Sequence, residues 1–171
     1  SKDLTASGNT TTIGMTFNDD GTKLFIAGYS PTPAIVEYSL ATAYDVSTLS
    51  FTTLYDVSGQ DTSPHDVEFS TDGTKMFVVG TAGDSVDSYS LSVGFDLTST
   101  VTPLNTFPNG RGETSLIGLA FNNDGTKMYL NGHIQDDVHE FDLATAWDIT
   151  NGIGTEVTHV QDFSIIAQDT S

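Results

Sequence analysis

The sequence predicts an all-β protein in which one four-stranded unit is repeated three times. A pattern of the form Phe-x-x-Asp-Gly-Thr-Lys begins at Phe17, Phe69 and Phe121, which gives a period of 52 residues (69 − 17 and 121 − 69). A fixed period of this length marks a repeat architecture. In each copy Asp-Gly separates two stretches of apolar alternation, which is the strongest local signal for a tight β-hairpin. No segment has the 3.6-residue periodicity of an amphipathic helix, so we expect helix to be effectively absent.

Each repeat contains four short segments with strand character, bounded by turn residues. The first segment alternates, and the second, such as 24–27, is apolar at every position. We expect strands at 11–17, 23–27, 34–40 and 49–57; at 65–69, 75–79, 85–91 and 101–107; and at 116–121, 127–131, 137–143 and 156–165. An aromatic turn precedes each fourth strand, at Tyr44, Phe95 and Trp147. Because these rings recur at the same place in every repeat, we interpret them as packing between units rather than as a glycan platform.

Four antiparallel strands in a unit of this length are typical of a propeller blade. The physics agrees, because a second strand that is apolar on both faces must be covered on both sides, and neighbouring blades provide that cover. The segment Phe-Ser-Thr-Asp-Gly-Thr-Lys-Met-Phe-Val-Val-Gly, from Phe69, resembles the blade motif of YVTN-type and lactonase-like β-propellers, distant relatives of WD-repeat proteins. The resemblance extends over all three repeats. It implies blade architecture and says little about function, since propellers carry many unrelated activities.

Three blades are too few to close a ring, because closed propellers have four to eight. We therefore expect residues 1–171 to be one propeller half, with blades at 11–57, 63–107 and 114–165, which forms a six-bladed ring as a homodimer. Residues 1–10 share the register of 53–62 and are interpreted as a remnant of a preceding blade's last strand. The alternatives are a piece of a longer propeller chain, or a nine-bladed ring formed by a trimer.

The charge balance limits the partners. The chain has 23 acidic and five basic residues, for a formal net charge of −18, and it has no cysteine. Such a surface repels nucleic acid and anionic membranes, and no apolar run has the length of a membrane span, so neither nucleic-acid binding nor membrane insertion is expected. The missing cysteines exclude disulfides and thiol catalysis. The acidity suits an extracellular protein or one on a cell or virion surface.

Metal sites are not indicated by the spacing of the possible ligands. The acids of Asn18-Asp19-Asp20 are adjacent, whereas a calcium loop needs ligands at alternating positions and a distal carboxylate. The four histidines, at 65, 133, 139 and 159, have no close metal-ligand spacing. We expect no cofactor, and calcium is the one ion left open.

Candidate binding residues come from the loops and from departures from the repeat. Loops that join the fourth strand to the next blade, and the second strand to the third, gather on one rim of a propeller and vary most between the repeats. His65 stands where the other repeats have Ile13 and Ile117, and the neighbouring Asp66 and Glu68 also replace small or neutral residues. Arg111 is the only arginine and could bind a carboxylate or sulfate. The candidates are Asp61, His65, Asp66, Asp84, Arg111, Glu113, Asp136 and Asp137.

No catalytic motif appears in the sequence: there is no Gly-x-Ser-x-Gly elbow, phosphate loop, His-Glu-x-x-His helix or dinucleotide fingerprint. The favoured hypothesis is therefore a non-enzymatic binding module that holds a glycan or protein in its rim loops or central channel. The first alternative is a metal-dependent lactonase-like or glycan-cleaving hydrolase that uses rim carboxylates. The second is a purely structural repeat segment of a larger surface or virion protein.

Overall fold

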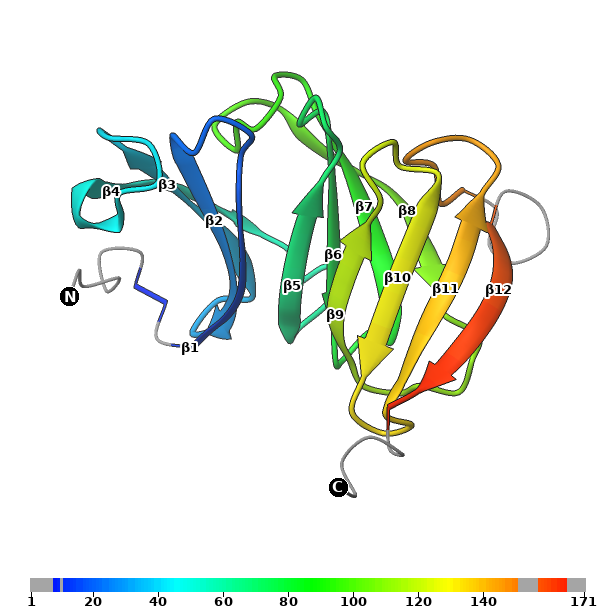
Figure 1. Cartoon of the computed structure of the whole chain (residues 1–171). Coiled ribbons are helices and arrows are strands. Elements are labelled where there is room, and N and C mark those ends of the chain that lie inside the picture. The colour runs from blue at the N-terminus through cyan, green and yellow to red at the C-terminus, as the bar shows by residue number, and fades with distance from the viewer. Residues whose placement is uncertain (1–7, 10, 151–156, 166–171) are drawn as a thin grey trace.

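The protein is an all-β molecule of three four-stranded antiparallel sheets, as the sequence predicts (Figure 1). A computed structural model describes residues 8–9, 11–150 and 157–165. The strands are β1 (Thr11–Phe17), β2 (Lys23–Ser30), β3 (Ala34–Leu40), β4 (Leu49–Asp56), β5 (Pro64–Phe69), β6 (Lys75–Gly80), β7 (Ser85–Leu91), β8 (Val101–Pro108), β9 (Leu116–Phe121), β10 (Lys127–Gly132), β11 (Asp137–Leu143) and β12 (Val157–Ser164). The one helical turn among the described residues is the 3-10 helix η2 (Val46–Thr48). None of these residues forms a helix long and apolar enough to span a membrane.

Each sheet is a blade with its strands in chain order, so that blade 1 is β1–β4, blade 2 is β5–β8 and blade 3 is β9–β12. The innermost strands contact one another from blade to blade, β1 with β5 and β5 with β9. Figure 1 shows the three sheets side by side, with β5 and β9 adjacent. The first strand of each blade therefore faces the position of the central channel in a propeller.

Two hydrophobic cores fill the spaces between the blades. One joins Phe25 and Ile35 of blade 1 to Met76 and Tyr89 of blade 2, and the other joins blade 2 to blade 3. Because side chains alternate along a strand, β2 and β6 bury residues on both faces, as the apolar runs predict. A third core, around Leu24 and Tyr38, lies on the face of blade 1 that points away from blade 2.

The repeated hairpin turn is stabilised by the aromatic residue before the fourth strand. Gly73 and Gly125 have φ of +69° and +71°, which favours glycine, and a Cβ at either would collide with the ring of Phe95 or Trp147 of the same blade. The backbone N–H groups of Phe95 and Trp147 donate to the carbonyls of these glycines, at 3.1 and 2.9 Å. The same rings approach the preceding blade, with Phe77 and Trp147 centroids 6.2 Å apart. The aromatic turn thus packs within its own blade and also between blades.

The observed strand bounds agree with the predicted ones to within a residue at most ends. The clearest difference is β2, which continues to Ser30 instead of ending at residue 27, because Gly28 and Ser30 still pair with Thr12 and Thr11 across irregular register. Of the predicted remnant strand at 1–10, residues 1–7 and 10 lie outside the described residues, as does Glu156 at the start of the predicted last strand.

Candidate functional site

The predicted rim acids Asp61 and Glu113 are buried and bound to the backbone. Oδ1 of Asp61 accepts a hydrogen bond from the Ser63 N–H (2.6 Å), and Oδ2 accepts one from the Gly83 N–H (3.0 Å). Glu113, 52 residues later, accepts from the N–H groups of Ser115 (2.9 Å) and Gln135 (3.0 Å). Each carboxylate therefore ties the loop before the first strand to the loop between the second and third strands. Both of its oxygens are engaged.

Two further predicted acids of this rim are turn residues. Asp84 and Asp136 are equivalent positions with φ of +51° and +54°. The backbone carbonyl of Asp84 accepts from the side-chain amide of Asn109 (3.0 Å), and that of Asp136 accepts from the Ile165 N–H (3.0 Å). Burial raises the pKa of Asp84, and the charges of Asp61 and Glu113 add to the effect. Asp137 is the first residue of β11 and pairs with Ser164.

Arg111 belongs to a charged cluster on the outer strands of blade 3, which the sequence did not predict. Its guanidinium Nη2 lies 2.7 Å from Oδ2 of Asp162. The other oxygen of Asp162 lies 2.6 Å from Nδ1 of His139 and 2.7 Å from Nε2 of His159. Burial acts to raise the pKa of Asp162, but the bonds from His139, Arg111 and His159 outweigh it and hold the pKa well below its usual range. His139 and Asp162 replace Val36 and Leu54 of blade 1, which are the matching cross-strand pair.

This cluster has the composition of a metal site, with two imidazoles and a carboxylate whose ligand atoms lie within 4.8 Å of one another. The guanidinium of Arg111 already neutralises the carboxylate, however, and a second cation at Asp162 would be repelled by it. The arrangement accounts better for the anchoring of β12 to the loop between blades 2 and 3. Sequence spacing did not reveal it because His139 and His159 meet only through the pairing of β11 with β12.

The channel-facing strand β5 carries the polar residues that depart from the repeat. Nδ1 of His65 lies 2.8 Å from the Ser63 carbonyl oxygen, and its ring stacks on Tyr29 with centroids 6.0 Å apart. Asp66 accepts from the Leu119 N–H of the neighbouring blade (3.0 Å) and from the Val67 N–H (3.0 Å). Asp66 therefore links β5 to β9, and His65 contacts blade 1.

Glu68, two residues along the same strand, lines a cavity of about 430 Å³ between the three blades. Burial raises the pKa of Glu68 to about 7, and the negative charge of Asp66 adds to the shift. The cavity walls include the aromatic rings of Phe95, Phe121 and Trp147. Asn122 and Asn123 also line it, and the side-chain amide of Asn122 is bonded within its own turn, donating to Oγ1 of Thr126 (3.0 Å) and accepting from the Lys127 N–H (2.9 Å). A carboxyl that is partly protonated at neutral pH can both donate and accept hydrogen bonds.

The cavity is a candidate site that the sequence identified only in part. Glu68 is visible as a departure from the repeat, since Thr16 and Ala120 occupy its place in the other blades. The asparagines and aromatic rings gave no such signal, because they belong to the turns that every blade repeats. The predicted residues His65 and Asp66 lie on the same strand as Glu68 but do not line the cavity. The other predicted residues do not line it either: Asp61, Asp84, Arg111, Glu113, Asp136 and Asp137.

Comparison with known proteins supports the fold. No family model matches the sequence, and no curated protein matches it either. Among solved structures, a protein from Lactobacillus plantarum matches with a TM-score of 0.61 and 15% identity, over 94% of this chain and 44% of that one. The Pseudomonas aeruginosa periplasmic gluconolactonase matches with a TM-score of 0.53 and 20% identity, over 92% of this chain and 42% of that one. The β-propeller domain of Swd1 from Myceliophteria thermophila matches with a TM-score of 0.59 and 9% identity, over 92% of this chain and 46% of that one.

These matches show that the chain has the β-propeller fold, with lactonase-like and WD40-type propellers among its structural neighbours. The chain spans less than half the length of each of these three structures. At such low identity the likeness extends to the fold and leaves the activity open.

Proposed function

We propose that this propeller segment is a non-enzymatic binding module that holds an uncharged, hydroxyl-rich ligand, such as a neutral glycan, in the cavity around Glu68. The observation that supports this most is the half-buried Glu68 carboxyl, with a pKa of about 7, on a residue that lines the cavity together with aromatic residues. Sugar hydroxyls need groups that both donate and accept, and aromatic rings offer flat apolar surface to sugar faces. An extracellular or cell-surface or virion-surface location fits the acidity and remains part of the proposal.

The charge of the chain favours a neutral ligand. With a formal net charge of −18, the protein repels anions, and the one arginine is paired with Asp162. Phosphorylated or sulfated sugars would have no unpaired guanidinium to meet them. Calcium is the one ion left open by the sequence, and in the first turn Oδ1 of Asp20 already accepts a hydrogen bond from the Thr22 N–H at 2.9 Å.

The test is binding of neutral and sulfated oligosaccharides on a glycan array, followed by calorimetric titration with the best neutral oligosaccharide. Replacing Glu68 by Ala should weaken binding by about tenfold or more, because a central hydrogen-bonding group is lost. Glu68→Gln, which resembles the protonated carboxyl, should keep binding and remove its dependence on pH between about 5 and 8.

The control is Asp56→Asn, which removes one negative charge from β4 and keeps an oxygen for the Ser58 N–H that donates to it. This variant should bind like the wild type. If no neutral oligosaccharide binds, or if Glu68→Ala binds as tightly as the wild type, the proposal is wrong.

A second candidate function is hydrolysis of a neutral lactone, since a carboxyl with a pKa near 7 suits a general acid or base. The similarity to a gluconolactonase supports a fold that can carry this reaction, but it does not assign a role to any residue. The assay is release of acid from glucono-δ-lactone above the spontaneous rate, where Glu68→Gln should abolish the excess. Loss of the activity with EDTA would indicate a metal-dependent route. Among the described residues the one candidate ligand group, His139, His159 and Asp162, lies on the outer strands of blade 3.

A further inference from the structure

The outer face of blade 3 matches faces that are buried in the other two blades. Phe163 of β12 pairs with Val138 of β11, just as Phe107 pairs with Val86 in blade 2. Phe107 is completely buried against blade 3, whereas Phe163 is 57% exposed. Val138 is only partly buried, although Val86 is fully buried. Blade 3 thus presents a face of the kind that receives a following blade.

On the face of blade 1 that points away from blade 2, residues of the inner strand and the aromatic turn are exposed, although their counterparts in the other blades are buried. Val46 is 53% exposed, whereas its counterparts Leu97 and Ile149 are 5% and 2% exposed because each packs against a preceding blade. Met15 is 65% exposed, although its counterpart Val67 is buried. Leu24 and Tyr38, farther out on the same face, are already buried. The area that is exposed in blade 1 but buried in the other blades is therefore the part around Met15 and Val46.

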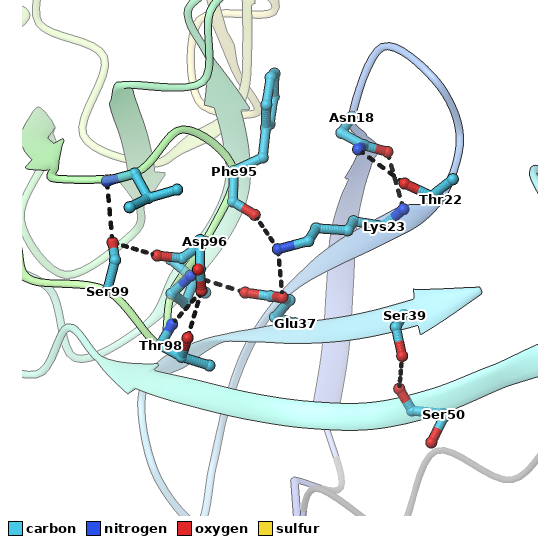
Figure 2. Close-up of polar contacts among 12 residues, drawn as sticks. Asn18, Thr22, Lys23, Glu37, Ser39, Ser50, Phe95, Asp96, Thr98 and Ser99 are labelled. Atoms are coloured by element: carbon cyan, nitrogen blue, oxygen red, sulfur yellow. Dashed lines mark hydrogen bonds and ion pairs between the residues drawn. The ribbon is translucent and has the colours of Figure 1, made fainter. Parts of the chain in front are cut away.

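A set of directed hydrogen bonds, which we call the blade clamp, joins blade 1 to blade 2 (Figure 2). Nζ of Lys23 donates to the Phe95 carbonyl at 2.6 Å and lies 2.9 Å from Oε1 of Glu37. Oε2 of Glu37 accepts from the Leu97 N–H at 2.7 Å. Glu37 is 1% exposed, so this clamp is a buried and specific contact.

The lysine of the clamp recurs between blades 2 and 3 and again beyond them. Nζ of Lys75 donates to the Trp147 carbonyl at 2.8 Å. The third copy, Lys127, pairs with Glu140 and Asp142, each at 2.6 Å. Glu140 occupies the register of Glu37, because it pairs with Tyr129 as Glu37 pairs with Phe25. Blade 3 therefore carries both side chains of the clamp.

We propose that the outer face of blade 3 binds the face of blade 1 around Met15 and Val46 in a second copy of this chain. In that interface Lys127 donates to the Tyr44 carbonyl and Glu140 accepts from the Val46 N–H, as Lys23 and Glu37 do for Phe95 and Leu97. A second copy is the occupant that the repeat itself specifies, because its blade 1 supplies the aromatic turn in the register that the clamp requires. Two reciprocal interfaces close a ring of six blades, a number within the range for propellers. The proposal does not depend on the ligand of the Glu68 cavity.

The first test is the mass in solution, measured by light scattering during gel filtration over a range of protein concentrations. A dimer of 36.4 kDa, twice the 18.2 kDa chain, is expected, and a monomer at every concentration would overturn the proposal. Val46→Glu should yield a monomer, because it buries a charge in the interface. The control is Val93→Glu, since Val93 is 54% exposed on a turn of blade 2. It should remain a dimer, and equal effects of the two substitutions would also contradict the proposal.

The second test does not depend on whether a charged variant folds. The chain has no cysteine, so a disulfide formed by engineered cysteines is unambiguous. Oxidation of the variant with Val46→Cys and Glu140→Cys should link two copies covalently, because the clamp places these positions next to each other across the interface. The matched variant with Val93→Cys and Glu140→Cys should stay largely unlinked. Equal cross-linking of both variants would show that this interface does not form.

Discussion

Glu68 shows how one residue outside the repeat pattern changes the chemistry of a repeated scaffold. Its carboxyl is half-buried beside the charge of Asp66, so ionisation costs more in the folded than in the unfolded protein. Its pKa rises from the ordinary 4.5 to about 7 on folding. Between these values the folded state holds a proton that the unfolded state has lost. Folding stability from this group is therefore complete below about pH 4.5 and is lost as the pH rises through about 7.

The first prediction follows from this loss of folding stability with rising pH. Glu68→Gln cannot ionise, so its free energy of unfolding should exceed that of the wild type by about 1–2 kcal/mol more at about pH 8 than at about pH 5, after allowance for partial solvent exposure. Urea unfolding of both proteins at the two pH values measures the difference. Asp56→Asn is the control and should show no such trend. A gap between wild type and Glu68→Gln that stays constant with pH would contradict a shifted pKa.

At this scale the sequence was informative where a residue broke the repeat and uninformative where it kept to it. His65, Asp66 and Glu68 stand out because two other blades provide the comparison. Asp61 and Glu113 also attracted attention as rim acids, but one oxygen of each accepts from a backbone N–H two residues away and the other from a loop more than 20 residues away in the chain. Such a bond depends on loop geometry, which residue type and spacing do not specify.

At the scale of the element, the Asp-Gly turn and the aromatic turn form one structural unit in each blade. The turn glycine supplies a positive φ, and its missing side chain leaves the space that the aromatic ring fills. Both halves of the unit were visible in the sequence at a 52-residue period or close to it. Their contact was not, because the ring that packs on Gly125 is Trp147, two strands farther along the chain.

We therefore predict that Gly125→Ala destabilises the protein through two effects. An alanine there adopts a strained φ, and its Cβ overlaps the indole of Trp147, for a loss of about 1–3 kcal/mol. Trp147 is the only tryptophan, so its fluorescence reports the displacement directly. Emission of the folded variant should shift to longer wavelength as the ring becomes more exposed, and thermal unfolding should occur at lower temperature.

Gly59→Ala is the matched control, because Gly59 has no atom within 4 Å of an added Cβ and no positive φ. It should change stability by less than about 0.5 kcal/mol and leave the emission unchanged. Equal stability of the two variants would mean that the turn relaxes around the added methyl group.

At the scale of the whole molecule, the strand order and blade count were readable from the sequence, because period and alternation determine them together. That three blades are too few to close a ring follows from the same count. What required the structure was the clamp of Lys23 and Glu37, since a cation that bonds to a backbone carbonyl in the next blade leaves no pattern of its own.

The net charge gives the last prediction, which concerns the assembly. Two chains of −18 each repel one another, and a ring of two carries −36 (2 × −18). Two kinds of contact are proposed across the interface: packing of apolar faces, and hydrogen bonds from charged side chains to neutral backbone groups. Salt weakens both kinds of contact little. Screening of the long-range repulsion should therefore dominate. The dissociation constant of the dimer should fall by about tenfold as sodium chloride rises from about 0.02 M to about 0.5 M.

Sedimentation velocity at several protein concentrations in each salt measures this constant. Val46→Glu is the control and should remain a monomer throughout, which separates screening at the proposed interface from general salting-out. A dissociation constant that rises with salt would mean that ion pairs between the chains hold the assembly together. Lys127 would then bond a carboxylate of the second copy and not the backbone carbonyl of Tyr44, and the register of the ring would differ from that of the blade clamp.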